Sequence, residues 1–157
     1  MRKSMTAAGV ALALAACGGG GGGGGGPVGG GNVPAVAGTY QATFTALSAT
    51  GCQGIVEPGS STTGTLVVTQ SGSSVTLRIS DLRPEFAGNP VGSLSTSGAF
   101  HFGPGPVPID PTPGSDGDEF SAVGTFDGTF SGDAMSISFD FTALEVCRVT
   151  GTIVGQR

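Results

Sequence analysis

The fold is decided by the run FSAVGTFDGTFSGDAMSISFDFTA at positions 120–143. In its first half, from Phe120 onward, every second residue is Phe, Ala or Gly, which is the period of a β-strand with one buried face. A turn at Ser131–Ala134 sets Phe126 opposite Phe139 in the second half. The apolar faces of the two halves then coincide, so this run predicts an antiparallel hairpin.

A second hairpin is predicted upstream by the same requirement that apolar faces agree in register. A turn at Ser71–Ser74 sets Val68 opposite Leu77 and Leu66 opposite Ile79. Both pairs join apolar residues, so two more strands of the same kind are expected here.

A third hairpin is predicted between these two. Its connection, Thr96–Gly98, is short and places Gly98 where a left-handed backbone conformation is required. This turn sets Leu94 opposite Phe100 and leaves His101 on the outer face.

The two ends of the region 38–157 supply the first and last strands. No stretch between them has the helical spacing of apolar residues. The sequence therefore predicts an all-β fold, a single small antiparallel up-and-down β-barrel of about eight strands. The buried faces of its end strands consist of Tyr40, Ala42, Phe44 and Ala46, and of Cys147, Val149, Gly151 and Ile153.

The composition excludes several classes of protein. The chain has 157 residues, of which 11% are charged and 31 are Gly, and its formal net charge is −5. So few charges argue against a charge-driven disordered chain. An acidic protein also lacks the basic surface that binding to nucleic acid requires, so no nucleic-acid partner is expected.

The N-terminus has the pattern of a secretion signal. Arg2 and Lys3 precede an apolar run, Met5–Ala16, which is too short to cross a bilayer as a stable helix. The run ends in Leu14-Ala15-Ala16-Cys17.

This ending resembles the signal of bacterial lipoproteins. The resemblance implies that residues 1–16 are removed, that diacylglycerol is attached to the Cys17 thiol, and that the new amino terminus is acylated. The resemblance thus implies a lipid-anchored protein of the cell envelope, and Gly18 rather than Asp after the cysteine implies the outer membrane, as in enterobacterial lipoproteins. The alternative is an ordinary signal peptide whose removal leaves Cys17 as a free thiol.

Residues 17–37 form the expected tether. Nine consecutive glycines follow Cys17, and such a segment cannot bury enough apolar surface to offset the entropy of ordering it. A Gly-rich coil of this length has an end-to-end distance of roughly 25 Å, enough to hold a small domain clear of lipid headgroups.

The two other cysteines predict how the sheet closes. Once Cys17 is modified, Cys52 and Cys147 are the only pair left, and an oxidising compartment favours a disulfide between them. Cys52 follows the first strand and Cys147 starts the eighth, so a bridge requires these two strands to meet at one rim. That favours a closed barrel over the alternative, a β-sandwich with a cross-sheet disulfide.

Inward phenylalanines are the candidate ligand-lining residues. An eight-stranded barrel can fill its interior with side chains or hold one small apolar ligand. The candidates are Phe44, Phe100, Phe102, Phe126, Phe139 and Phe141.

For the rest of the chain we predict no catalytic residue, no metal site and no cofactor. His101 is the only histidine and is expected on an exposed strand, where a nucleophilic triad is difficult to build. The carboxylates of 116–119, with Asp110 nearby, lack the spacing of an EF-hand loop. Residues 103–118 hold five prolines and are expected to form a long loop, either for recognition or as a stiff extension.

A second, short resemblance lies within the opening run. Residues 124–132, GTFDGTFSG, resemble the Gly-x-Phe-x-Gly repeats in the barrels of transferrin-binding and factor-H-binding lipoproteins. The Pro, Ala and Glu pattern that follows in those barrels is absent, so binding of a host protein is not carried over.

Three functions are therefore compared. The first is a non-catalytic, membrane-anchored binding or interaction module, which contacts an unknown protein through its rim loops. The second is a carrier of a small apolar molecule inside the barrel. The third and least favoured is an envelope hydrolase that uses His101 or the acidic loop.

Overall fold

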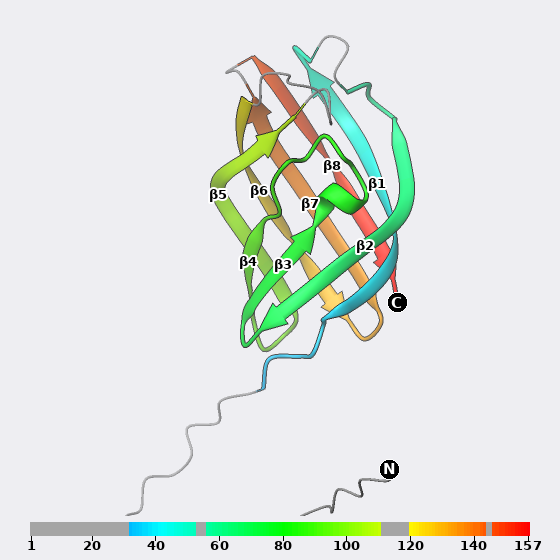
Figure 1. Ribbon diagram of the computed structural model, residues 1–157, viewed down its shortest axis with the longest axis vertical. Helices are drawn as coiled ribbons and strands as arrows, with labels where there is room; N and C mark the ends of the chain where they lie inside the picture. Colours follow the sequence, from blue (N-terminus) through cyan, green and yellow to red (C-terminus); the bar gives the residue numbers. More distant parts are fainter. Residues whose placement is uncertain (1–31, 53–55, 111–119, 144–145) are drawn as a thin grey trace, which may run out of the picture. The chain divides into compact units, whose positions relative to one another are not determined.

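A computed structural model, which describes residues 32–52, 56–110, 120–143 and 146–157, has eight antiparallel strands in one closed barrel. Neighbours in the chain are neighbours in the barrel, as Figure 1 shows. The predicted all-β, up-and-down barrel is thus confirmed, and the sandwich alternative does not occur. The strands are β1 (Gly38–Thr50), β2 (Ser61–Ser71), β3 (Ser74–Arg78), β4 (Val91–Leu94), β5 (Ala99–Ile109), β6 (Phe120–Ser131), β7 (Ala134–Ala143) and β8 (Cys147–Gln156).

Closure is made by β1 pairing with β8. The register runs from Gln41 opposite Gln156 to Thr50 opposite Arg148, with one irregularity between Ala46 and Ser48. Beyond the end of this ladder a disulfide joins Cys52 to Cys147, with the Cα atoms 4.5 Å apart. The predicted disulfide is confirmed, and it lies at the rim where the first and last strands meet.

The short hairpins keep their predicted registers. Phe126 lies opposite Phe139, and Val68 lies opposite Leu77. The third hairpin sets Leu94 opposite Phe100. Its Gly98 has a φ of 82°, in the left-handed region that only glycine adopts without strain.

One predicted pair, Leu66 opposite Ile79, is wrong. Strand β3 ends at Arg78, and a short 3₁₀ helix, η1 (Ile79–Asp81), begins there. The Ile79 carbonyl accepts hydrogen bonds from the backbone N–H groups of Leu82 and Arg83, at 2.9 and 2.8 Å. That carbonyl is therefore taken by a turn and not by the sheet, although the Ile79 side chain is still fully buried.

The segment 79–90 fills the part of the wall that the short strands β3 and β4 leave open. Figure 1 shows it on the near side of the barrel, between β2 and β5. On one side Arg83 Nη1 donates to Thr62 Oγ1 of β2 at 3.2 Å. On the other side Phe86 forms a β-bridge with Ile109 of β5. A non-strand segment thus completes the barrel.

The long loop predicted at 103–118 is wrong in its first half, because residues 103–109 continue strand β5. The register with β6 shifts between Phe102 and Gly105, and the Gly103–Pro104 peptide bond is cis. Proline is compatible with a strand where its missing N–H faces away from the neighbour. Residues 111–119, including the acidic cluster, lie outside the described residues.

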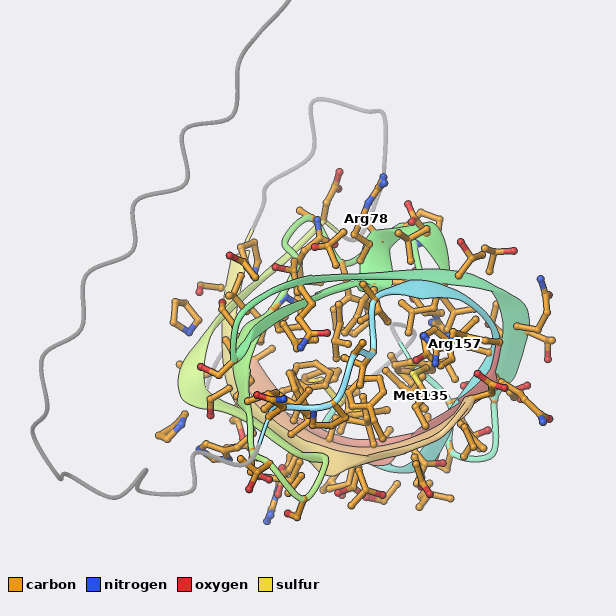
Figure 2. All side chains as sticks on the ribbon, turned by 90° about the horizontal axis from the view of Figure 1, so that it is seen from below. Arg78, Met135 and Arg157 are labelled. Atoms are coloured by element: carbon orange, nitrogen blue, oxygen red, sulfur yellow. A yellow bond between two sulfur atoms is a disulfide. The ribbon has the colours of Figure 1, made fainter. Side chains whose placement is uncertain are left out.

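The barrel is apolar inside and polar outside. Every described residue that is buried has an apolar or aromatic side chain, and the Tyr40 hydroxyl donates to the Val36 carbonyl at 2.9 Å. Figure 2, seen from below, shows side chains filling the ring of strands, with Met135 inside it and Arg78 outside. No helix in the described part of the chain is long and apolar enough to span a bilayer.

Residues 33–37, which the composition assigns to the tether, already pack on the barrel. Val36 is buried, and its N–H donates to Gln70 Oε1 at 2.8 Å. Arg157 Nη1 donates to the Ala37 carbonyl at 3.1 Å, and the guanidinium lies 5.6 Å from the centre of the Tyr40 ring. The chain enters at the lower rim, beside its own C-terminus, opposite the rim that holds the disulfide (Figure 1).

Gly151 provides a test of the close packing between β8 and its neighbours. A Cβ atom on Gly151 would lie 2.1 Å from the Thr45 carbonyl oxygen and 2.4 Å from the Phe139 ring. Because backbone and a packed ring both block the added atom, we expect Gly151→Ala to lower the free energy of unfolding by about 2 kcal/mol or more. Urea denaturation followed by circular dichroism measures this change.

The matched control is Gly64→Ala. Its added Cβ atom meets only the Leu82 Cδ1 atom, at 3.2 Å, and that side chain can shift. We expect a change of less than about 1 kcal/mol. Equal losses in the two variants would contradict the close approach at Gly151.

Candidate functional site

The predicted lining residues form a column of aromatic rings inside the barrel. Phe44 stacks on Phe139 at 4.5 Å between ring centres, and Phe139 stacks on Phe141 at 5.5 Å. Phe100 and Phe126 are also buried, whereas Phe102 is only half-buried and meets Phe126 edge-on at 5.8 Å. All six candidates therefore contribute to one aromatic core.

Phe86 belongs to this core but was not among the predicted residues. It is 2% exposed and packs against Phe44 at 5.8 Å and against Phe141 at 5.5 Å. The sequence around it, with Pro84 and Gly88 close by, has no alternation that would indicate an inward side chain. Phe86 is buried because the segment 79–90 forms part of the barrel wall.

A small cavity lies beside Phe86, at the rim that holds the disulfide. Its volume is about 20 Å³, which is room for roughly one water molecule. The rings thus fill the space that a ligand would need. Its apolar lining comes from Phe44, Phe86, Ile109, Phe141 and Val149.

Arg83 and Glu85 stand at the mouth of this cavity. The Arg83 side chain is 14% exposed and forms an ion pair with Glu85. Its guanidinium lies 4.9 Å from the centre of the Phe44 ring, a cation–π contact. Arg83 also donates a hydrogen bond to Thr62 Oγ1. The charge of this largely buried guanidinium is therefore compensated by a carboxylate and a hydroxyl group.

His101 pairs with a carboxylate on the outer wall. The register between β5 and β6 sets it opposite Asp127, with His101 Nδ1 and Asp127 Oδ1 2.5 Å apart. Both side chains are more than half exposed, as predicted for His101. This hydrogen bond raises the pKa of His101 above its ordinary value.

The neighbouring hydroxyl groups do not complete a nucleophilic triad. Ser93 Oγ donates to the carbonyl of His101 at 3.5 Å, and Ser138 Oγ donates to the carbonyl of Asp127 at 3.0 Å. Both hydroxyls thus bind backbone oxygen and not the imidazole ring, whereas a serine nucleophile must reach the base. The arrangement is a surface pair between neighbouring strands.

The structure describes only some of the other residues considered as candidate sites. In the described ranges no three His, Cys, Asp or Glu side chains lie close enough together to hold a metal ion. The backbone N–H of Asp110 donates to the Glu85 carbonyl at 2.7 Å, which ties the end of β5 to the segment 79–90. Cys17, the predicted lipidation site, lies outside the described residues, like the cluster at 116–119.

The raised pKa of His101 predicts a defined titration. Since the chain has one histidine, its imidazole signal can be followed by NMR without assignment, and we expect its midpoint above 6.5. Asp127→Asn should lower the midpoint, because the carboxylate that raises the pKa of His101 is removed. Because folding raises the pKa of His101, the pair with Asp127 stabilises the folded state fully below pH 6.5. Its contribution to the free energy of unfolding is lost as the pH rises through the pKa that His101 has in the folded state. Equal midpoints in both proteins would exclude the pair in solution.

Removal of the Phe86 ring is expected to open the core. Phe86→Ala should lower the free energy of unfolding by about 3–5 kcal/mol, because a buried ring is replaced by a hole. Such an apolar hole binds benzene, so benzene should raise the unfolding temperature of the variant and leave the parent protein unchanged. The half-buried Phe102 provides the control, since Phe102→Ala should cost less and give no benzene effect. A Phe86→Ala variant as stable as the parent would show that this ring does not fill the core.

The chain was compared with protein-family models, with curated proteins and with solved structures, and it matches none of them.

Proposed function

We propose that this chain is a non-catalytic lipoprotein of the cell envelope, which presents its barrel as a binding module on a lipid-anchored tether. The observation that carries the proposal is the filled interior, where the cavity of about 20 Å³ leaves no room for an organic ligand. Contacts with a partner must then be made by the outer wall and the rims.

The proposed anchor is consistent with how the chain enters the barrel. Residues 33–37 are held at the lower rim by hydrogen bonds to Gln70 and Arg157. If the tether is attached at the lower rim, the rim with the disulfide and segment 79–90 lies at the opposite end of the barrel. The disulfide itself suits an oxidising compartment outside the cytoplasm.

The lipid supplies the membrane affinity in this proposal. One acyl chain binds a membrane only marginally, whereas two or more hold it stably. Diacylglycerol on Cys17 together with an acylated amino terminus would give three chains, a permanent anchor to the proposed outer membrane. The polar outer wall of the barrel then has no need to contact lipid.

A carrier of a small apolar molecule is the second candidate, and it requires the cavity beside Phe86 to widen by movement of that ring. That cavity is apolar and has Arg83 at its mouth, a suitable partner for an anionic headgroup. Arg83 is already paired with Glu85, and the ligand would have to displace the Phe86 ring. For both reasons we rank the carrier below the binding module as a function of this chain.

The anchor is tested by the mass of the mature protein isolated from membranes of the host. We expect a chain that begins at Cys17 and carries diacylglycerol and one further acyl group. Cys17→Ala should abolish both cleavage and lipid addition, because the acceptor sulfur is lost. The double variant Cys52→Ala, Cys147→Ala is the control and should still be lipidated. A mature chain with an unmodified Cys17 would overturn the anchor.

Native mass spectrometry of the same material separates the two candidates. The binding module predicts the mass of the lipidated chain alone. An added small molecule that disappears when Phe86 is changed to Trp, which should narrow the cavity, would favour the carrier instead.

A further inference from the structure

A groove runs across the outer wall of four neighbouring strands, β6, β7, β8 and β1, near the rim where the chain enters the barrel (Figure 1). Its volume is about 430 Å³, far larger than the cavity inside the barrel. None of the residues that line it is charged. Its outward side chains include Gln41, Ser131, Ala134, Ser136, Val154 and Gln156, and we call these six residues the amide–hydroxyl groove.

The strand register brings these six residues together from distant parts of the chain. Gln41 of β1 lies opposite Gln156 of β8, which lies opposite Ala134 of β7. Ala134 in turn lies opposite Ser131 of β6. Four neighbouring strands span about 14 Å, which is wide enough for a short chain of sugar rings. The small Ala134 side chain between longer neighbours accounts for the hollow in the middle of this row.

The backbone beneath the groove is already paired. The ladder between β7 and β8 runs without a break from Ala134 to Ala143, and the ladder between β6 and β7 is continuous as well. A strand of a partner protein therefore finds no edge here to which it could add. A ligand of this groove must be bound by side chains.

The polar side chains of the groove are available to a ligand. In the described part of the chain, the Ser136 hydroxyl and the Gln156 carboxamide have no hydrogen-bond partner. Elsewhere on the same wall, hydroxyls of neighbouring strands bond to each other, as Thr43 and Thr63 do at 3.0 Å. The groove thus differs from the rest of the wall in presenting polar groups that the protein does not use itself.

The lining favours an uncharged ligand that is rich in hydroxyl groups. A carboxamide and a hydroxyl can each donate and accept hydrogen bonds, as the hydroxyls of a sugar do. A phosphate, carboxylate or ammonium ligand would find no opposite charge among the lining residues. Val154, which is 53% exposed, and Ala134 offer apolar contact for the C–H face of one ring, but too little for an acyl chain.

We propose that the amide–hydroxyl groove binds a linear, uncharged oligosaccharide laid across β6, β7, β8 and β1. Gln41 and Gln156 bind sugar hydroxyls at one end, Ser131 and Ser136 bind them at the other, and Val154 contacts the face of a ring. Because paired strands hold these groups in place before binding, little order has to be created when the ligand arrives. This proposal deepens the proposed function, on which it rests, by naming the surface of the module and the chemistry of its partner.

The test uses the mature protein isolated from membranes of the host, labelled with ¹⁵N and kept in a detergent without a sugar headgroup. The probes are cellotetraose and chitotetraose, which are linear and uncharged, and binding is followed by NMR. We expect saturable shifts of the amide signals of Ser136, Val154 and Gln156 with at least one probe. No saturable shift with either probe, or shifts confined to other parts of the barrel, would overturn the proposal.

A charged oligosaccharide tests the preference for uncharged ligands. A hyaluronan tetrasaccharide has the same kind of ring hydroxyls but also carries carboxylates. We expect it to bind about tenfold or more weakly than the better uncharged probe, because the groove has no cation to compensate a carboxylate as it leaves water. Equal binding of the two at the groove would contradict the assigned class of ligand.

Variants at exposed positions test the location. Gln156→Ala should weaken binding of the better probe about tenfold, because the hydrogen bonds of the carboxamide are lost. Ala134→Leu should weaken it as well, because the larger side chain fills the hollow. The control is Thr69→Ala on β2, which removes an exposed hydroxyl outside the groove and should leave binding unchanged. Unchanged binding in both groove variants would overturn the location. Lipidation at Cys17 is measured separately, so failure here leaves the anchored module standing.

Discussion

The pairing of β1 with β8 is the constraint on which the rest of the structure depends. It removes the two free edges that an open sheet would expose to other chains. It also brings Cys52 to Cys147 across a sequence separation of 95, and a crosslink over so long a loop contributes up to roughly 4–5 kcal/mol in the chain-entropy model. Without this pairing the aromatic column would have one side in water.

Closure also limits the space inside the barrel. A closed barrel of this size encloses just enough space for its own side chains, and here the rings of Phe44, Phe139 and Phe141 occupy it. The irregular part of the wall is where β3 and β4 are short and segment 79–90 takes their place. The cavity beside Phe86 and a surface groove lined by Pro90, Val91, Phe102 and Pro106 both adjoin that segment. This groove and the small cavity thus lie where the wall departs from regular strand pairing.

The accuracy of the sequence-based predictions depended on the length of each connection. Where a turn is short, as at Ser71–Ser74, the turn sets the register and the pairs next to it were predicted correctly. Where a connection is long, the register is free, and Asp127 was not predicted as the partner of His101. The prolines of β5 indicated a loop because proline rarely enters a strand, yet here they lie on an edge that needs no donors.

Local alternation along the chain was enough to predict the number of strands, their inward faces and the closure that the two cysteines require, because these depend on residues that are close in sequence or covalently linked. The burial of Phe86, the His101–Asp127 pair and the groove beside Pro106 depend on segments brought together only when the barrel closes. Such contacts are long-range, and no periodicity in the sequence records them, so only the tertiary structure decided them.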